Sequence, residues 1–537
     1  MIFSFKKTSH LLCTQHYYNK TLIRKALLIL NLAFGISFLY AQKNTKIELI
    51  KANSLEFDKS LNKEVRRLIG NVVLKHDETF MYCDSAYLYS ETNRFDAFSN
   101  IHIKVSDSVD VWGDLLKYDG NSRLAELNHN CKMVDNQSTL TSDCLFYDLK
   151  NDIAYYNSGG NIDNAENNLK SKIGRYYSKE KMFFFKDKVV LTNPKYTINS
   201  DTLKYNTVTE VSYFLGPTTI VSKENTIYCE NGWYDSRNDL SQFSKNAYMK
   251  NKEQVLKGDS LYYDRTNGYG KAIKNVTITD LKENLVIYGD YGEYFEKTEF
   301  TQVTEKPYLV KIFEGDSLFL HADTLNSRLD SIGGKRILYA FKHVKFYKTD
   351  LQGISDSIVF FFSDSTINLY GTPVIWNDEN QLTADFIKII IGNNVIKELQ
   401  MYASSFIVSE NDSLNFDQIK GKDMVGYFDD SKLHIIDVKG NGQTVYLVKD
   451  DDGSRTGINT SESSALRIYL KENKVERIIF KSKPDATLFP IKDMPEDKKL
   501  LKGFKWLKNL RPIDKNDIFN WRVMPGVGKP PPKSDSK

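Results

Sequence analysis

The stretch Gly258-Asp259-Ser260-Leu261-Tyr262-Tyr263-Asp264 has the alternation of a β-strand with one buried face. Side chains of a strand point to its two faces in turn, so Asp259, Leu261 and Tyr263 share a face. A turn follows at 265–268, and the chain alternates again from 272 to 278, with Val276 and Ile278 on one face. The stretch therefore predicts an up-and-down pair of strands.

This pattern returns at a fixed period. Tyrosines stand 29 residues apart at Tyr118, Tyr147, Tyr176, Tyr205, Tyr234 and Tyr263, and the series continues with small shifts through Tyr294, Phe360 and Tyr427 and backward through Leu88 and Phe57. An apolar residue often stands two positions earlier, as at Leu55, Leu116, Leu145, Leu203, Leu261 and Ile358. A repeat of this length indicates stacked structural units rather than the core of a globular enzyme.

Composition supports an all-β fold. The chain of 537 residues has 32 Tyr and 31 Phe but only 12 Pro, and no helical periodicity is sustained between residues 45 and 480. We therefore expect a repetitive stack of antiparallel two-strand units, each of about 30 residues. Gly, Asp and Asn inside the strands predict bends or bulges.

An aspartate recurs four residues before many of the period positions. These residues are Asp84, Asp114, Asp143, Asp201, Asp259, Asp290, Asp356 and Asp423. A row of acids for catalysis or calcium binding is one interpretation. One acid per unit at a predicted bend is more simply a hydrogen-bonding device of the turn.

The N-terminus resembles a secretory signal. Residues 1–41 carry five Lys and Arg and no acid, and an apolar run from Ala26 ends at Ala41-Gln42. This order of regions predicts cleavage after Ala41 and export to the periplasm. The alternative is a membrane anchor, although about 16 apolar residues are short for a span of about 20. Without this segment the excess of 73 basic over 69 acidic residues becomes a net charge of −1, which argues for no nucleic-acid partner.

No motif for an enzyme, a cofactor or a metal is found. The sequence lacks a nucleotide-binding loop and the HExxH, GxSxG and CxxC patterns. The cysteines Cys83, Cys131, Cys144 and Cys229 have no metal-ligand spacing, and we expect them to be buried and unpaired, with a disulfide as the alternative. We therefore expect neither catalysis nor a cofactor.

The C-terminal segment departs from the repeat. Pro495 and two acids precede Leu500, Leu501, Phe504 and Leu507, which predicts a short helix with one apolar face. We expect this segment to cap the open edge of the stack. A docking element for a partner is the alternative. The last eight residues, 530–537, have the composition of a disordered tail.

An N-terminal signal followed by repeated A/S-D-x-L-x-Y-D and (G/S)-N-V-x-I motifs resembles the OstA/LptA-like family. The resemblance is clearest at 52–74, 200–205 and 258–278 and extends over most of 45–430. It implies a β-jellyroll in the form of an open V, with an apolar inner face that holds acyl chains. This chain is several times longer than a typical bridge protein of that family, and it lacks the translocon's membrane barrel.

The resemblance implies a periplasmic bridge for lipopolysaccharide or a related acylated glycolipid. Its implied partners are other bridge components, joined end to end by strand addition, and the outer-membrane translocon. The expected lipid-groove residues are Leu55, Phe57, Leu116, Tyr118, Leu145, Tyr147, Tyr176, Leu203, Tyr205, Tyr234, Leu261, Tyr263, Val276 and Ile278. Their alternative role is packing alone.

The expected organisation is a signal peptide at 1–41, an OstA/LptA-like repeat domain at 45–300, more divergent repeats at 301–480 and a C-terminal segment at 481–537. Two other functions stay open. A secreted solenoid that acts on carbohydrate would need catalytic groups gathered at one level of the stack. A structural β-array would bind no ligand.

Overall fold

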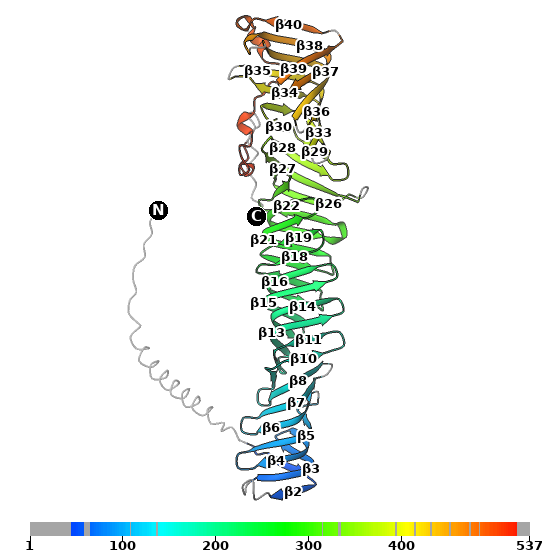
Figure 1. The fold of residues 1–537 in the computed structure, drawn as a ribbon, viewed down its shortest axis with the longest axis vertical. Helices are drawn as coiled ribbons and strands as arrows, with labels where there is room; N and C mark the ends of the chain where they lie inside the picture. Colours follow the sequence, from blue (N-terminus) through cyan, green and yellow to red (C-terminus); the bar gives the residue numbers. More distant parts are fainter. Residues whose placement is uncertain are drawn as a thin grey trace, which may run out of the picture. The chain divides into compact units, whose positions relative to one another are not determined.

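The computed structural model describes residues 45–57, 65–107, 109–135, 138–313, 315–330, 334–392, 395–412, 415–429, 432–450, 453–471, 474–482 and 484–522. The chain divides into two compact units. Unit 1 comprises residues up to 136 together with 143–152, and unit 2 comprises 137–142 and residues from 153 onward (Figure 1). The predicted signal segment and the tail at 530–537 lie outside the described residues.

Unit 1 is built from antiparallel strands that pair in chain order from β3 to β7, with β1 and β2 side by side along β3. The strands of unit 1 are β1 (Glu48–Lys51), β2 (Ser54–Phe57), β3 (Val65–His76), β4 (Thr79–Tyr89), β5 (Arg94–Lys104), β6 (Val109–Asp119) and β7 (Leu124–Asp135), and β8 (Ser138–Asp148) contributes its second half. Along β3, β4 and β6 buried residues alternate with more exposed ones over much of each strand, as the pattern predicts, whereas β1 and β2 have no buried residue.

Unit 2 continues the same antiparallel architecture. Its strands are β9 (Ile153–Tyr156), β10 (Gly160–Asp163), β11 (Asn168–Ser171), β12 (Ile173–Tyr177), β13 (Met182–Asn193), β14 (Tyr196–Asn206), β15 (Val211–Ser222), β16 (Thr226–Asp235), β17 (Leu240–Ser244), β18 (Tyr248–Lys250), β19 (Gln254–Lys257), β20 (Ser260–Asp264), β21 (Tyr269–Asp280), β22 (Leu285–Phe295), β23 (Phe300–Thr304), β24 (Tyr308–Ile312), β25 (Ser317–His321), β26 (Thr324–Leu329), β27 (Arg336–Lys348), β28 (Leu351–Phe361), β29 (Thr366–Tyr370), β30 (Val374–Asn377), β31 (Asn380–Thr383), β32 (Phe386–Gly392), β33 (Val395–Tyr402), β34 (Ser405–Glu410), β35 (Phe416–Gly421), β36 (Asp423–Asp429), β37 (Lys432–Lys449), β38 (Arg455–Lys471), β39 (Lys474–Lys481) and β40 (Asp485–Phe489). The helical turns are η1 (Glu296–Thr298), η2 (Ile491–Asp493), α2 (Glu496–Lys499), η3 (Lys508–Leu510) and η4 (Asp517–Phe519). None of the helices described is long and apolar enough to cross a membrane.

Two consecutive residues in the left-handed conformation recur along the strands of both units, and at Gly159 and Gly216 a single left-handed glycine stands instead. In unit 2 such a pair is Lys274-Asn275, with φ angles of 57° and 50°. The strand pairing shifts register across this pair, between Ile273 and Val276. The same shift occurs in unit 1 across Ser99-Asn100. Each pair bends its strand at mid-length, which confirms the bends predicted from Gly, Asp and Asn.

The recurring acids hold these bends. The Asp259 carboxylate accepts a hydrogen bond from Asn275 Nδ2 at 3.0 Å, and the Asp259 N–H donates to the carbonyl of Lys274. The same acid–asparagine bond, with the partners again 16 residues apart, joins Asp84 to Asn100 and Asp114 to Asn130. The interpretation of the acids as hydrogen-bonding devices is confirmed at these positions.

The bends divide the strands of unit 2 into two ladders. We call ladder A the series β18, β19, β24, β25, β30, β31, β34, β35 and β40, and ladder B the series β17, β20, β23, β26, β29, β32, β33, β36 and β39. The long strands β21, β22, β27, β28, β37 and β38 cross the bend and give one half to each ladder. The core lies between the ladders, since Leu320 and Leu382 of ladder A share one apolar cluster with Leu325 and Ile387 of ladder B.

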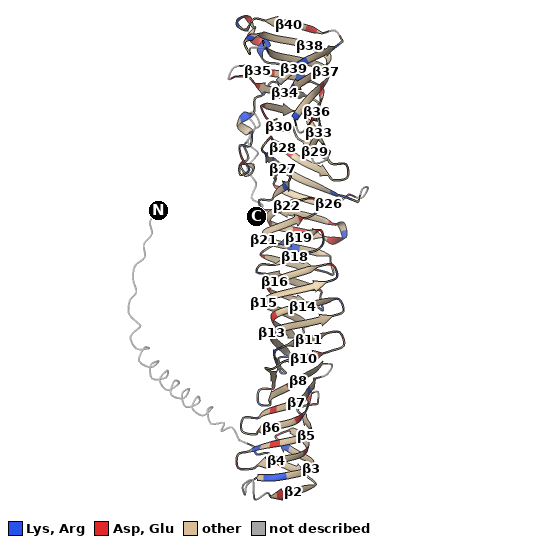
Figure 2. Ribbon diagram, viewed as in Figure 1, with Lys and Arg blue, Asp and Glu red and all other residues tan. Residues whose placement is uncertain are grey.

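The fold class predicted from the sequence is confirmed: the chain is all-β, antiparallel and built from repeated bent pairs of strands. The cysteines named above form no disulfide; Cys83, Cys131 and Cys229 are buried and Cys144 is half-buried. Acidic and basic side chains both occur along each unit (Figure 2).

Residues 491–522, which we call the strap, run along the outer face of ladder A (Figure 1). Leu507 and Leu510 of the strap pack on Ile354, Val374 and Trp376. Farther along the ladder, Met494 packs on an apolar patch formed by Val445, Leu447 and Ile458. We expected a cap over the open edge of the stack, whereas these contacts extend along the face of ladder A.

The helix predicted through Leu507 is wrong, because α2 ends at Lys499. Two buried glutamines bind the strap backbone instead. Gln418 contacts the carbonyl of Lys499 and the N–H of Leu501, both at 2.8 Å, and Gln381 contacts the carbonyl of Lys505 and the N–H of Leu507, both at 2.7 Å. A helix would use these backbone groups internally, so the tertiary contacts override the local helical pattern.

Replacement of Asn275 tests the bend. Asn275→Val places a β-branched residue at positive φ and should lower the local free energy of opening by about 1–2 kcal/mol. Asn275→Gly keeps the backbone conformation and loses only an exposed hydrogen bond, for about 0.5 kcal/mol. Hydrogen exchange of the amides in β20 and β21 measures both changes. Equal losses in the two variants would contradict a conformational role for this position.

Candidate functional site

An apolar cavity lies between the two ladders of unit 2. Its volume is about 270 Å³. The ladder A side is formed by β22, β24, β25, the second half of β27 and the first half of β28. The ladder B side is formed by the first half of β27, the second half of β28, β29 and β32. The apolar lining residues are Leu285, Leu309, Phe313, Leu318, Leu320, Leu338, Ala340, Phe346, Leu351, Ile358, Phe360, Phe362, Ile367, Leu369, Ile389 and Ile391.

The bent fold leaves this space beside a packed core. Near the bend the ladders touch, and Ala340, Ile358 and Leu369 are at most 5% exposed. Toward the hairpin turns the lining side chains, such as Phe362 and Ile391, become half-buried. The cavity therefore opens on the turn side, where the two ladders have no covalent connection to close them.

A glycine makes room for one large lining side chain. Phe346 on β27 lies opposite Gly353 on β28, and a Cβ atom on Gly353 would lie 2.3 Å from Cζ of Phe346. Every residue except glycine would force the ring to move. The position of the Phe346 ring in the wall thus depends on Gly353.

The opening carries charged groups. The Lys311 ammonium donates a hydrogen bond to the backbone carbonyl of Glu283 and lies 3.7 Å from the Glu283 carboxylate. Lys335 is exposed on the ladder B side, with its Nζ 3.5 Å from the carbonyl of Phe362. A molecule with an apolar part inside and a polar part outside therefore meets both kinds of surface here.

The polar residues of the lining lie together on one side of the cavity. They are Glu283, Lys311, Lys335 and Ser365, all on the turn side. In the part of the chain that the structure describes, no three His, Cys, Asp or Glu side chains gather as metal ligands. The interior of the cavity is thus apolar, and its polar residues are confined to the opening.

A family model described as OstA-like protein matches residues 44–201 and 226–311. Over these residues, which make up less than half of the chain, the sequence is similar to OstA-like proteins. The prediction of an OstA/LptA-like family from the repeated motifs is thereby confirmed. No curated protein matches the chain.

Among solved structures, the chain is similar to LptH from Pseudomonas aeruginosa, described as the LptA-homologous periplasmic component of the conserved lipopolysaccharide transport device. The likeness covers 22% of this chain and 81% of that chain, with 12% identity and a TM-score of 0.19. The likeness thus extends over nearly all of the shorter protein and about a fifth of this one.

The OstA-like match ends at residue 311, and most of the cavity lies beyond it. Only its ladder A margin, with Leu285, Leu309 and Lys311, falls inside the matched residues. The divergent repeats thus contribute most of the wall.

The predicted groove residues lie mainly in the interior of each unit. In unit 1, Leu116, Tyr118, Leu145 and Tyr147 are buried, whereas Leu55 and Phe57 on β2 are 39% and 68% exposed. In unit 2, Tyr176, Leu203, Leu261 and Val276 are buried, and Tyr205, Tyr234, Tyr263 and Ile278 are half-buried. Ile278 packs against the apolar cluster that contains the cavity's lining residues. Their assignment to a lipid groove stays a prediction.

The period tyrosines also tie strands to turns. The Tyr234 hydroxyl donates to the Asp239 carboxylate at 3.0 Å, and the Tyr263 hydroxyl donates to that of Glu296 at 2.7 Å. Burial, followed by the hydrogen bond to Asp239, raises the pKa of Tyr234 to about 12. These hydroxyls are therefore engaged within the fold.

Sequence reasoning missed most of the cavity, although the period passes through it. Ile358 and Phe360 occupy the apolar and aromatic positions of the 29-residue pattern, and both line the wall. The dense Ile, Leu and Phe content of 336–391 marks an apolar region of the chain, but it does not indicate a cavity.

Two matched alanine substitutions test whether the cavity is empty space that a side chain can fill. Ala340 lines the cavity, and Ala322 is fully buried in the same core cluster. Ala340→Leu should leave stability nearly unchanged, whereas Ala322→Leu should cost about 1–3 kcal/mol through overpacking. Urea unfolding compares the two variants. A larger loss for Ala340→Leu would mean that the wall is already close-packed there.

Proposed function

We propose that this OstA-like protein shields the acyl chains of lipopolysaccharide or a related acylated glycolipid between ladders A and B, and acts as a bridge on the way to the outer membrane. The observation that carries the proposal is the apolar cavity that opens on the turn side. Each CH₂ group removed from water contributes about 0.8 kcal/mol, so a long acyl chain gains greatly from such a surface.

The charges at the opening suit the polar part of such a lipid. Acyl chains would lie against Leu320, Leu338 and Phe346, with the headgroup outside. Lys311 and Lys335 present ammonium groups to an anionic headgroup, and Glu283 already neutralises part of the charge of Lys311. This division of surfaces supports a carrier rather than an enzyme, and it requires no cofactor.

The groove residues predicted from the sequence in unit 2 are proposed as the continuation of the same apolar surface, and those predicted in unit 1 as an apolar surface of that unit. In unit 2 their buried members, such as Leu203 and Leu261, occupy the interior side of their strands. We place the loading point at the cavity, because free volume is found there.

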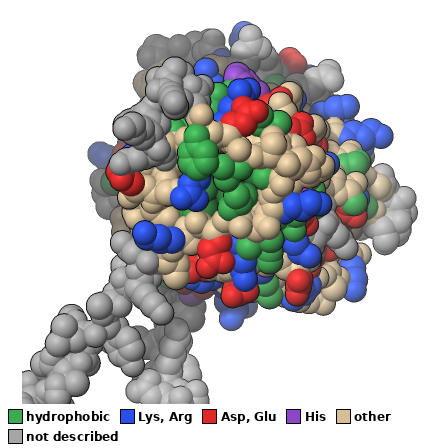
Figure 3. All heavy atoms as spheres, turned by 90° about the horizontal axis from the view of Figure 1, so that it is seen from below, with side chains coloured by type: hydrophobic (Ala, Val, Ile, Leu, Met, Phe, Trp, Pro, Cys, Tyr) green, Lys and Arg blue, Asp and Glu red, His purple; other side chains and the backbone are tan. Residues whose placement is uncertain are grey.

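The end of unit 1 is the proposed docking surface for other bridge components. Strands β1 and β2 are the first of the unit and carry exposed Ile50, Leu55 and Phe57. Figure 3, which looks onto this end, shows apolar side chains gathered at its centre with charged groups around them. A partner could extend the sheet here by strand addition, with the outer-membrane translocon as one partner. We place the mature protein in the periplasm after removal of residues 1–41.

Purification without detergent, followed by mass spectrometry of bound lipid, tests the proposed function. We expect an acylated glycolipid to co-purify with the wild type and to be lost from Leu338→Asp, because a charge in the wall costs several kcal/mol to bury. Lys388→Asp on β32 is the control, since Lys388 is only half-buried and is not a lining residue. A folded protein that carries no lipid would favour a structural array.

A second pair of variants tests whether the predicted groove extends through β14. Leu203 is fully buried and Lys204, its neighbour on the opposite face, is half-buried. Leu203→Asp should destabilise the adjacent strands strongly, and Lys204→Asp should do little. Loss of bound lipid from Leu203→Asp with a folded cavity region would support a continuous groove. Equal effects at both positions would contradict the assigned faces.

A further inference from the structure

Four strands of ladder A present the cavity on one face and the strap on the other. On β25, Leu318 and Leu320 line the cavity, while Phe319 and His321 point outward. The His321 ring packs against the Phe519 ring of the strap, with the ring centroids 4.9 Å apart. On β24, Leu309 lines the cavity and Tyr308 meets the same Phe519 ring. The strap therefore lies on the outer surface of the cavity wall itself.

The same alternation continues on β27 and β28. Phe346 and Leu351 line the cavity, whereas Lys345 and Gln352 face the strap. The Gln352 side-chain oxygen accepts a hydrogen bond from Arg511 Nε at 2.8 Å. Of two adjacent residues on one strand, one thus lines the cavity and the other contacts the strap. A shift of the strand therefore changes the cavity lining and the strap contact together.

A buried ion pair fixes the strap to this wall. Lys345 and Asp517 have side chains only 1% and 5% exposed, and Lys345 Nζ lies 3.2 Å from the Asp517 carboxylate. Lys345 also donates to the carbonyl of Asn520, and Arg522 binds the second oxygen of Asp517 at 2.7 Å. Removal of one partner leaves a buried charge without compensation, so this pair holds the strap at one position on the wall.

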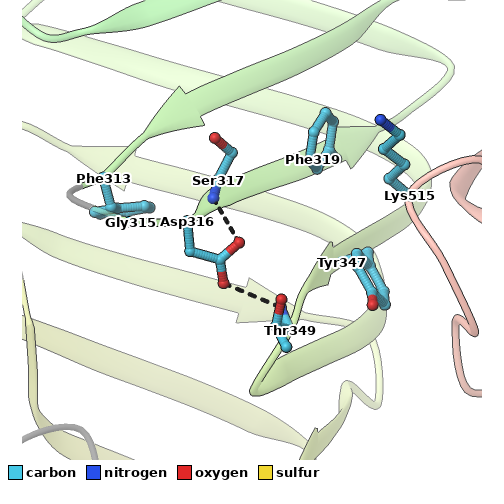
Figure 4. A pocket seen from close by; sticks show the side chains of 8 residues that line it. All are labelled: Phe313, Gly315, Asp316, Ser317, Phe319, Tyr347, Thr349 and Lys515. Carbon is cyan, nitrogen blue, oxygen red and sulfur yellow. Dashed lines mark hydrogen bonds between the residues drawn. The ribbon is translucent and has the colours of Figure 1, made fainter.

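The strap also reaches the cavity opening. A shallow cleft on the outer surface is lined by Phe313, Asp316, Phe319, Tyr347 and, from the strap, Lys515 (Figure 4). Phe313 lines this cleft and the cavity as well. Lys515 Nζ lies 5.7 Å from the centre of the Phe319 ring. Phe313 thus stands between the cavity and a cleft to which the strap contributes Lys515.

We infer that the strap controls the cavity: its docked state holds ladder A in place, and its release allows the wall to move outward and admit a larger apolar ligand. This inference rests on the proposed function, since it describes regulation of the same cavity. By linkage, a ligand that binds better when the strap is released must itself favour release, by the same factor.

Hydrogen exchange on the full-length protein tests the inference, with dansylated undecanoate as the apolar probe. Saturating probe should speed exchange of the amides in 511–522 about fivefold, within the usual range of coupling between sites. Amides in β36 on ladder B provide the internal reference. Unchanged or slower exchange in 511–522, with the probe bound, would overturn the inference while leaving the proposed function intact.

Two variants test the reverse direction. Asp517→Asn removes the partner of Lys345, and Gln381→Leu removes a backbone anchor elsewhere on the strap. Each should tighten binding of the probe about fivefold, as linkage requires. Lys508→Ala, which breaks an exposed pair with Glu410, is the matched strap control and should bind like the wild type.

Protection of the β36 amides shows whether each variant is folded, and Gln381→Leu decides alone if Asp517→Asn does not fold. If Asp517→Asn or Gln381→Leu is folded and binds the probe with wild-type affinity, the inference that the strap controls the cavity is overturned. A wild type that binds no probe would contradict the proposed function and the inference together.

Discussion

The left-handed backbone that bends the strands is the constraint on which the rest of unit 2 depends. Without it, a strand such as β21 would stay in one sheet, and its two halves could not join separate ladders. The bend brings ladders A and B face to face, and their buried side chains then form the core. Because non-glycine residues occupy the left-handed region at a cost, the acid–asparagine bonds that stabilise it recur with the bend.

Ladders A and B face each other and are joined only at the bend. This arrangement explains where a ligand can enter. Side chains near the bend pack tightly, whereas those near the turns have neighbours on fewer sides. The cavity forms around Ala340, where the lining side chains leave part of the space between the ladders unfilled. The strap lies on the opposite surface of the same wall, where Ile354 and Trp376 would otherwise be exposed.

Much of the fold could be predicted because the repeat is local. Alternation over 258–278 and the 29-residue spacing define the strands and their pairing, and Asp259 marks a bend. The cavity could not be predicted, because a void depends on how side chains from strands far apart in sequence fit together. The strap was misjudged for a related reason: Leu501 and Leu507 have helical spacing, but Gln418 and Gln381, distant in sequence, bind their backbone.

The strap also sets the number of repeats beneath it. Gln352, Gln381 and Gln418 meet it at fixed positions, so each strand between them must keep its place along an extended segment of fixed length. Duplication of one two-strand unit there would carry Gln418 away from Leu501, whereas duplication before residue 285 would leave all three contacts unchanged. Related chains can therefore vary in length within the first part of the stack, while the part under the strap keeps a constant count.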